Sequence, residues 1–348
     1  MATTTIESCT MRIKLIDFDS KIPNLALMRL SSYHKANGDK VSLLRGSQSA
    51  ELFDAADKYY LSCVFRWNKK AALNTVQQLS EKCIAGGTGL DITSTLPAEV
   101  EQAQPDYSIY PDCDYAFGFI SRGCIRKCPW CVVPRKEGGL KRVATAQEIT
   151  GNRKKAIFID NNFLALPDYE KDLQWLAENK IVIDFNQALD ARLVDDKAAR
   201  LLAQCTWYPG IRLSLDSDGM IGQVKKAIDN LAKYGVQPNT IRIFTLIGFS
   251  GLESDLERLF KVHEWGAAPF PMGFRDVDTG DEPAKGWDKA VYKKYRRLIL
   301  RMPHAKSVWD DFRAVVTGGV PTSHAPDGGD HPAQLSFFYE SKPKWVAI

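Results

Sequence analysis

Residues 115–132 read YAFGFISRGCIRKCPWCV, an apolar run followed by three closely spaced cysteines. The apolar run predicts a strand, and Cys124, Cys128 and Cys131 follow it with the spacing C-x3-C-x2-C. Three thiolates on one loop can converge on one metal centre. Structural zinc sites and simple ferredoxin clusters normally use four protein ligands. Three clustered cysteines therefore predict an iron–sulfur cluster with one iron left for a ligand that is not protein.

The sequence around this loop repeats a strand followed by a helix. The six predicted strands are Tyr115–Ser121, Ala156–Ile159, Ile181–Phe185, Ile211–Leu215, Thr240–Ile247 and Pro269–Phe274. Two of the intervening helices are marked by apolar residues at helical spacing, one from Ile221 to Leu231 and one from Leu252 to Phe260. Six consecutive strand–helix units predict a partial (β/α)6 barrel over residues 111–280.

The cysteine spacing resembles the signature of the radical S-adenosylmethionine (SAM) superfamily, C-x3-C-x-aromatic-C, with Trp130 at the aromatic position. The resemblance implies a [4Fe-4S] cluster on the three cysteines, SAM chelated to the fourth iron, and an electron donor such as flavodoxin or ferredoxin. Reduction would cleave SAM to a 5′-deoxyadenosyl radical that abstracts hydrogen from a substrate. Residues 246–253 (LIGFSGLE) resemble the strand-five element of the family. This implies that Ile247 and Gly248 approach adenine.

Polar residues at the carboxyl ends of the predicted strands are the other candidates for cofactor binding, because function collects there in barrels. The family often has Gly-Gly-Glu after the second strand, where this chain has Asp160, Asn161 and Asn162. These could contact the SAM amine or simply cap a turn. The further candidates are Gln187, Arg192 and Ser214. Arg192 could bind the SAM carboxylate through two hydrogen bonds. No catalytic acid or base stands out.

Residues 1–110 predict a small Rossmann-like, doubly wound domain with a linker after about Asp91. Its predicted strands are Arg12–Phe18, Val41–Leu44, Tyr59–Phe65 and Cys83–Ala85. A helix is predicted to end at Asn37-Gly38. The arrangement resembles the cobalamin-binding subgroup of the superfamily, so cobalamin is a possible cofactor, although the Asp-x-His-x-x-Gly motif is absent. The run Gly86-Gly87-Thr88-Gly89 could cradle phosphate or form a tight turn.

Residues 281–348 predict a C-terminal extension with one basic helix and a mobile tail from Gly318 to Pro332. Between Lys285 and Arg313, nine Lys or Arg residues face three Asp, with five aromatic residues among them. Such a segment can bind phosphates and stack on bases. The alternative, which we favour, is an amphipathic helix that packs its aromatic residues on the barrel and leaves its lysines in water.

Composition limits the remaining possibilities. The net charge of +4 is too small to indicate nucleic-acid binding by itself. The first ten residues lack the apolar region of a signal peptide, and no apolar run approaches the ~18 residues of a membrane helix. We therefore expect a cytoplasmic protein with no membrane segment and reduced cysteines. Five cysteines lie outside the motif and are expected to be small buried residues, although an auxiliary cluster stays open: Cys9, Cys63, Cys83, Cys113 and Cys205.

Three functions remain open from the sequence. The first is a radical SAM enzyme whose substrate is a small molecule or nucleotide, with methylation, rearrangement or another C–H functionalisation as the outcome. The second is modification of a nucleotide or nucleic acid, as in the methylthiotransferase-like members of the superfamily. The third is a non-catalytic, zinc-stabilised binding protein, in which Cys113 or Cys205 would complete the zinc site.

Overall fold

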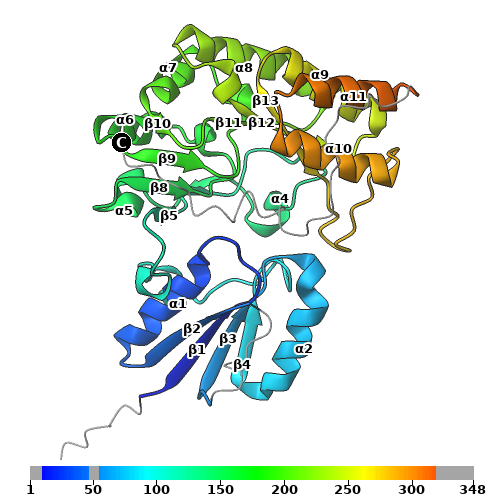
Figure 1. The fold of residues 1–348 in the computed structure, drawn as a ribbon. Helices are drawn as coiled ribbons and strands as arrows, with labels where there is room; N and C mark the ends of the chain where they lie inside the picture. Colours follow the sequence, from blue (N-terminus) through cyan, green and yellow to red (C-terminus); the bar gives the residue numbers. More distant parts are fainter. Residues whose placement is uncertain (1–9, 47–54, 319–348) are drawn as a thin grey trace, which may run out of the picture. The chain divides into compact units, whose positions relative to one another are not determined.

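The computed structural model describes residues 10–46 and 55–318. Cys9, the predicted absence of a signal peptide and the predicted tail beyond Gly318 lie outside the described residues. The chain divides into a first unit, residues 1–114 with 277–280, and a second unit, residues 115–276 with 281–348. Both units are mixed α/β with parallel sheets (Figure 1).

The first unit has one sheet of four parallel strands in the order β2-β1-β3-β4. The strands are β1 (Arg12–Asp17), β2 (Lys40–Arg45), β3 (Lys58–Ser62) and β4 (Cys83–Gly86), and the helices are α1 (Leu25–Ala36), α2 (Lys69–Leu79) and the short α3 (Ala98–Glu101). This strand order, with helices joining parallel strands, is that of a doubly wound sheet. The four strands predicted from the sequence are therefore confirmed.

Helix α1 shows how local sequence sets an element of this unit. Its N-terminus is capped by Asn24, whose side chain accepts a hydrogen bond from the Leu27 amide. Its C-terminus lies at Asn37 and Gly38, and Gly38 has a φ of 85°. Glycine adopts this left-handed conformation without the steric cost of a Cβ. The helix end predicted at Asn37-Gly38 is confirmed.

The predicted linker after Asp91 is part of the first unit's core. Val100 of α3 is buried in the cluster that also contains Leu15 and Leu27. Tyr110 is also buried, and its hydroxyl donates to Asp17 Oδ2 at 2.9 Å. This segment therefore contributes packing and a buried hydrogen bond to the sheet.

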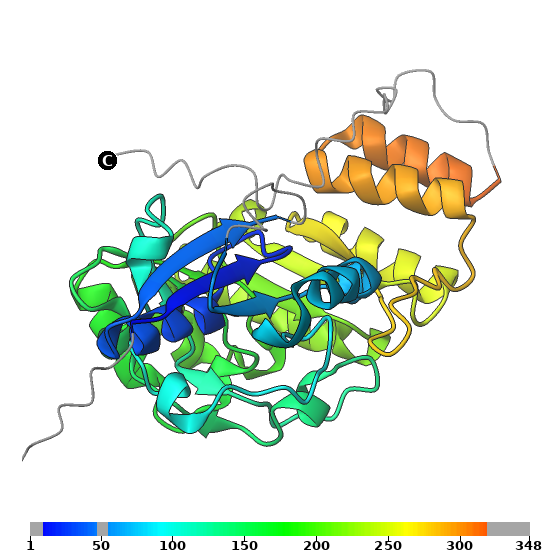
Figure 2. The ribbon, with the colours of Figure 1, turned by 90° about the horizontal axis from the view of Figure 1, so that it is seen from below.

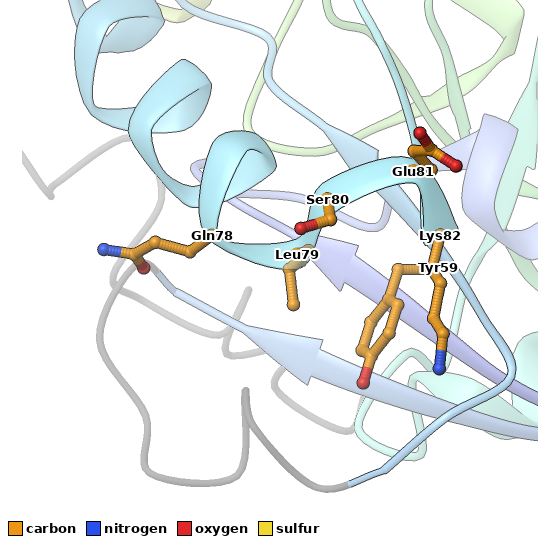
Figure 3. A pocket seen from close by; sticks show the side chains of 6 residues that line it. All are labelled: Tyr59, Gln78, Leu79, Ser80, Glu81 and Lys82. Carbon is orange, nitrogen blue, oxygen red and sulfur yellow. The ribbon is translucent and has the colours of Figure 1, made fainter.

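One pocket of the first unit, of about 530 Å³, lies at the amino ends of β3 and β4 (Figure 3). It is lined by Tyr59, Gln78, Leu79, Ser80, Glu81 and Lys82. Ligands of open α/β sheets bind at the opposite, carboxyl edge of the strands. The position of this pocket therefore does not indicate a cofactor site.

The second unit contains two parallel sheets that meet at Leu189. One sheet has the order β10-β9-β8-β5, and the other has the order β11-β12-β13. The strands are β5 (Ala116–Gly118), β8 (Lys155–Phe158), β9 (Val182–Phe185), β10 (Thr206–Trp207), β11 (Arg212–Leu215), β12 (Arg242–Ile247) and β13 (Ala268–Gly273). Leu189 forms a parallel bridge with Leu213 of β11. All six predicted strands of this region are present.

Helices cover one side of these strands (Figure 1). They are α5 (Ala146–Thr150), α6 (Tyr169–Glu178), α7 (Asp196–Gln204), α8 (Ile221–Lys233) and α9 (Leu252–Glu264). Val224 and Ile228 of α8 pack with Leu213 and Leu215 of β11 in the largest apolar cluster. The helical spacing read from the sequence thus points these side chains at the sheet.

The prediction of one basic helix after residue 281 was wrong. Two helices, α10 (Lys289–Arg301) and α11 (Lys306–Val316), lie side by side (Figure 2). Pro303 lies in the turn between them, where its ring cannot continue α10. The five aromatic residues of this segment are buried: Trp287, Tyr292, Tyr295, Trp309 and Phe312. They are therefore not available to stack on bases. Across the described ranges, no helix has the length and apolar character needed to span a bilayer.

Candidate functional site

The cysteine loop, residues 123–140, leaves the carboxyl end of the first strand of the second unit. It is closed at its base by an antiparallel ladder of β6 (Ser121–Arg122) and β7 (Lys141–Arg142), and it contains the one-turn helix α4 (Val133–Lys136). Gly123 has a φ of 79°, and a Cβ there would overlap the carbonyl oxygen of Gly139. Only glycine can make this close turn without strain, so the first residue of the loop is determined by the backbone.

The three motif thiols are half-buried and close enough to act on one another electrostatically. Burial raises the pKa of both Cys128 and Cys131, and the neighbouring thiols of the motif raise the pKa of Cys131 further. N–H groups point at the sulfurs. Cys124 Sγ accepts from the Arg126 amide and from Asn162 Nδ2, each at 3.3 Å. Cys128 is hydrogen-bonded to Arg192, and Cys131 to the Val133 backbone.

This donor set fits an iron–sulfur cluster by its chemistry. Such clusters are held by cysteine thiolates, and hydrogen bonds to the sulfurs set their reduction potential. In the described part of the chain, no three His, Cys, Asp or Glu side chains are already assembled in a metal-binding arrangement. Cys205, one candidate for a fourth zinc ligand, is buried in the apolar core and donates to Leu201 O at 3.5 Å. Burial raises its pKa to about 12.

Asp190 links the cysteine loop to the carboxyl ends of β8 and β9. Its carboxylate binds Arg192 through two hydrogen bonds of 2.6 and 3.0 Å, and Arg126 Nε at 3.1 Å. Asn162 Nδ2 is 3.4 Å from the same carboxylate. Burial alone would raise the pKa of Asp190, but the two guanidinium groups lower it below its usual value. Arg192, predicted to bind the SAM carboxylate, therefore already has a partner within the protein.

Asp160 and Asn161 fasten the base of the loop. The buried Asp160 carboxylate accepts hydrogen bonds from the Ile120 amide and from the amide and hydroxyl of Ser121, at 2.5–3.1 Å. Burial raises its pKa to about 6. Asn161 donates to Glu137, which also accepts from the Gly123 amide at 2.9 Å. Neither side chain is directed at the cysteine sulfurs, whereas Asn162 is.

Asn162 has a second property that matters for ligand binding. It is buried, and its Oδ1 has no hydrogen-bond partner. A buried acceptor without a donor is costly, and here it lies on the side chain that touches Cys124. Of the three residues predicted to contact the SAM amine, Asn162 is therefore the one with an oxygen still available.

Trp130, the aromatic residue of the motif, contacts residues that follow β11 and β12. Its indole donates to Asp216, which comes directly after β11, and burial raises the pKa of Asp216 to about 6. Its ring packs edge-on against Phe249, 5.5 Å away, and Phe249 packs against Phe274, 4.9 Å away. Phe249 and Phe274 follow β12 and β13, respectively.

The remaining predicted residues, as the structure describes them, form no hydrogen bond with the cysteine loop. Gln187 is exposed after β9, and Ser214 is half-buried on β11. The backbone at Ile247 and Gly248 is already used, because Ile247 O accepts from the Phe274 amide and Gly248 O accepts from the Lys285 amide. Gly248 has a φ of 84°, and a Cβ there would press on Ala284.

Sequence reasoning missed four residues that hold this site together: Arg126, Glu137, Asp216 and Phe249. Arg126 and Glu137 lie within the loop, where their pattern resembles ordinary surface charge. Asp216 follows an apolar strand, and a polar residue at a strand's carboxyl end was an available signal.

The loops at the carboxyl edge of the first unit's strands are held together by contacts with one another. After β1, the Asp19 carboxylate accepts hydrogen bonds from the Val64 and Phe65 amides at 2.7 and 3.0 Å. The glycine run after β4 packs on the same segment, since a Cβ on Gly87 or Gly89 would overlap the backbone of Cys63 or Phe65. Gly87 and Gly89 are therefore required by this close packing of two backbone segments, and no bound phosphate is needed to explain them.

Comparison of the chain with protein-family models and with curated proteins gave no match.

Proposed function

We propose that this chain is a radical SAM enzyme, with Cys124, Cys128 and Cys131 as the ligands of a [4Fe-4S] cluster and Asn162 and Trp130 beside the SAM site. The three cysteines would hold the cluster, and a bound cluster reduced by an external electron donor would supply one electron for the cleavage of SAM to methionine and a 5′-deoxyadenosyl radical. The proposal includes a partial (β/α)6 barrel. It is supported by the parallel bridge between Leu189, which follows β9, and Leu213 of β11, because this bridge links the two parallel sheets of the second unit.

One observation carries the proposal. Side chains of the cysteine loop bond to residues that follow three different strands, Asn162 after β8, Asp190 and Arg192 after β9, and Asp216 after β11. A structural zinc loop needs no such surroundings, because its four ligands complete the site. A cluster with one open iron needs neighbouring polar groups to bind and orient a second ligand.

In this proposal the protein's own residues bind and orient. Asn162 Oδ1 accepts a hydrogen bond from the SAM amine, because it is the buried oxygen without a donor. Asp190 holds Arg192 and Arg126 in place by charge, and Arg192 directs an N–H at Cys128. Trp130, Phe249 and Phe274 form an apolar wall that excludes water from the same edge.

The test is anaerobic purification followed by iron analysis and incubation with SAM and a reductant. The expected protein is brown, contains about four iron atoms per chain and releases 5′-deoxyadenosine. Cys124→Ser, Cys128→Ser and Cys131→Ser should each lose both properties. The matched control is Cys83→Ser, which changes a half-buried cysteine of the first unit and should keep both. Colourless protein that contains zinc would refute the proposal.

A further inference from the structure

The second unit has a charged layer on the face of its strands that lies opposite the apolar core. Leu213, Leu215 and Ile243 point into the core and are fully buried. Side chains at the alternate positions of β9, β11, β12 and β13 point away from this core and form what we call the inner face. They are Asp184, Arg212, Ser214, Arg242, Phe244 and Phe270. Ser214, Arg242 and Phe244 are half-buried. Parallel strands covered on both sides are nearly all apolar, so this polar face needs an explanation.

The pair at the centre of the inner face is buried and incompletely bonded. Arg212 and Asp184 are 6% and 4% exposed, and Arg212 Nη2 donates to Asp184 Oδ2 at 2.7 Å. Arg212 Nε and Asp184 Oδ1 have no hydrogen-bond partner. Nearly all buried polar atoms in proteins are paired. Two unpaired atoms on one ion pair indicate a place where a further polar group binds.

A second guanidinium stands beside the first. Arg242 is the register partner of Arg212 across β11 and β12. Burial lowers the pKa of Arg242, the charge of Arg212 lowers it further, and Asp184 opposes both effects. Arg212 and Arg242 therefore lie close enough for each charge to act on the other, with the Asp184 carboxylate beside both. An added anion between them would be favoured, because opposite charges stabilise the charged form of each arginine.

The aromatic residues next to the arginines give this place a wall. Phe244 and Phe270 are stacked with ring centres 4.7 Å apart, Arg212 lies over Phe244 and Arg242 lies over Phe270. An arginine held against a ring is pre-organised and loses little freedom when it forms hydrogen bonds to an oxyanion.

We propose that Arg212 and Arg242 bind an oxyanion, a carboxylate or a phosphate, at one end of the enzyme's small-molecule substrate. Asp216 follows β11, four positions after Arg212 and about 13 Å further along the chain at ~3.3 Å per residue. Asp216 accepts a hydrogen bond from Trp130 of the cysteine loop. The substrate class is therefore an elongated molecule with an acidic group at one end and its reacting carbon at the end nearer the cysteine loop. The identification as substrate rests on the proposed function, whereas anion binding does not.

The test is a thermal-shift titration of the purified full-length protein with sodium phosphate and, separately, sodium acetate at constant ionic strength. The dependence of Tm on ligand concentration gives the dissociation constant. Arg242→Gln should weaken binding by about tenfold or more, as expected for loss of a charged hydrogen bond. Asp184→Asn removes the competing carboxylate and should tighten binding. The control is Arg200→Gln, an exposed arginine of α7, which should bind as the wild type does.

The comparison of phosphate with acetate identifies the anion. Tighter binding of phosphate would indicate a phosphate group on the substrate, and tighter binding of acetate would indicate a carboxylate. Equal affinities in the wild type, Arg242→Gln and Asp184→Asn would overturn the inference. If circular dichroism shows that Asp184→Asn does not fold, the anion affinity of Arg242→Gln compared with that of Arg200→Gln is sufficient to test the inference. Anion affinities that follow the expected order without SAM cleavage would keep this site and refute the radical chemistry. SAM cleavage by a protein whose anion affinity is the same in all variants would support the radical chemistry and refute the anion site.

Discussion

Asp160 is predicted to make the free energy of unfolding fall between about pH 4 and pH 6. Its carboxylate is buried, and burial raises its pKa from 3.8 to about 6 despite three hydrogen bonds from Ile120 and Ser121. A group with a raised pKa in the folded protein binds its proton more tightly there. Its contribution to stability is therefore full below pH 3.8 and is lost as the pH rises through 6.

The size of the effect follows from the two pKa values. At pH 4 the preferential protonation of folded Asp160 contributes about 2 kcal/mol, and at pH 7 it contributes almost nothing. Asp160→Asn removes the titration while keeping the shape of the side chain. The stability of the wild type minus that of Asp160→Asn should therefore fall by about 2 kcal/mol from pH 4 to pH 7.

The assay is urea denaturation of both proteins at half-unit steps of pH, with the midpoint and slope fitted at each step. The control is Asp57→Asn, which should give the opposite sign. The Asp57 side chain is 45% exposed, and hydrogen bonds from Arg12 lower its pKa. A wild-type minus Asp160→Asn difference that stays flat or rises with pH would show that the three hydrogen bonds outweigh burial, and the reasoning would fail.

Three further predictions concern the cysteine loop. Gly123→Ala should lower the iron content and Tm, because its Cβ would overlap Gly139, whereas Gly139→Ala has open space and should keep both. Asn162→Ala should weaken SAM binding by about tenfold in equilibrium titration, and unchanged affinity would remove Asn162 from the site. Trp130→Phe deletes the donor to Asp216. It should cost about 1 kcal/mol in urea denaturation at pH 7 and less at pH 5, and an equal loss at both values would argue against this bond.

The order of strands and helices was accessible from the sequence because it depends on local patterns. Short, mainly apolar runs marked the strands, and the Asn37-Gly38 pair marked the end of α1. The break between α10 and α11 was missed, although Pro303 was visible, because charged residues continue on both sides of it. The segment after Asp91 was taken for a linker, since the packing of Val100 and Tyr110 depends on partners far away in the chain.

The candidate site could be predicted only in part for the same reason. The cysteines are grouped in sequence, and so is the run Asp160-Asn161-Asn162. Which of the three Asp and Asn side chains reaches a sulfur is decided by the turn after β8, and no pattern in the sequence separates Asn162 from Asp160. Asp190 and Asp216 acquire their roles from Arg126 and Trp130, which are 64 and 86 residues earlier in the chain, respectively.

These contacts imply that the protein sets the shape of the cysteine loop before any cluster binds. Arg122 pairs with Glu137, Arg126 pairs with Asp190, and Gly123 fixes the turn between them. In a zinc finger the metal supplies the folding free energy. Here the loop is tied by ion pairs and hydrogen bonds to the residues at the carboxyl ends of the strands. The three thiols can therefore be presented to iron at one edge of the sheet, with Asn162 and Arg192 already beside them, which is what binding of an incomplete cluster and a second ligand requires.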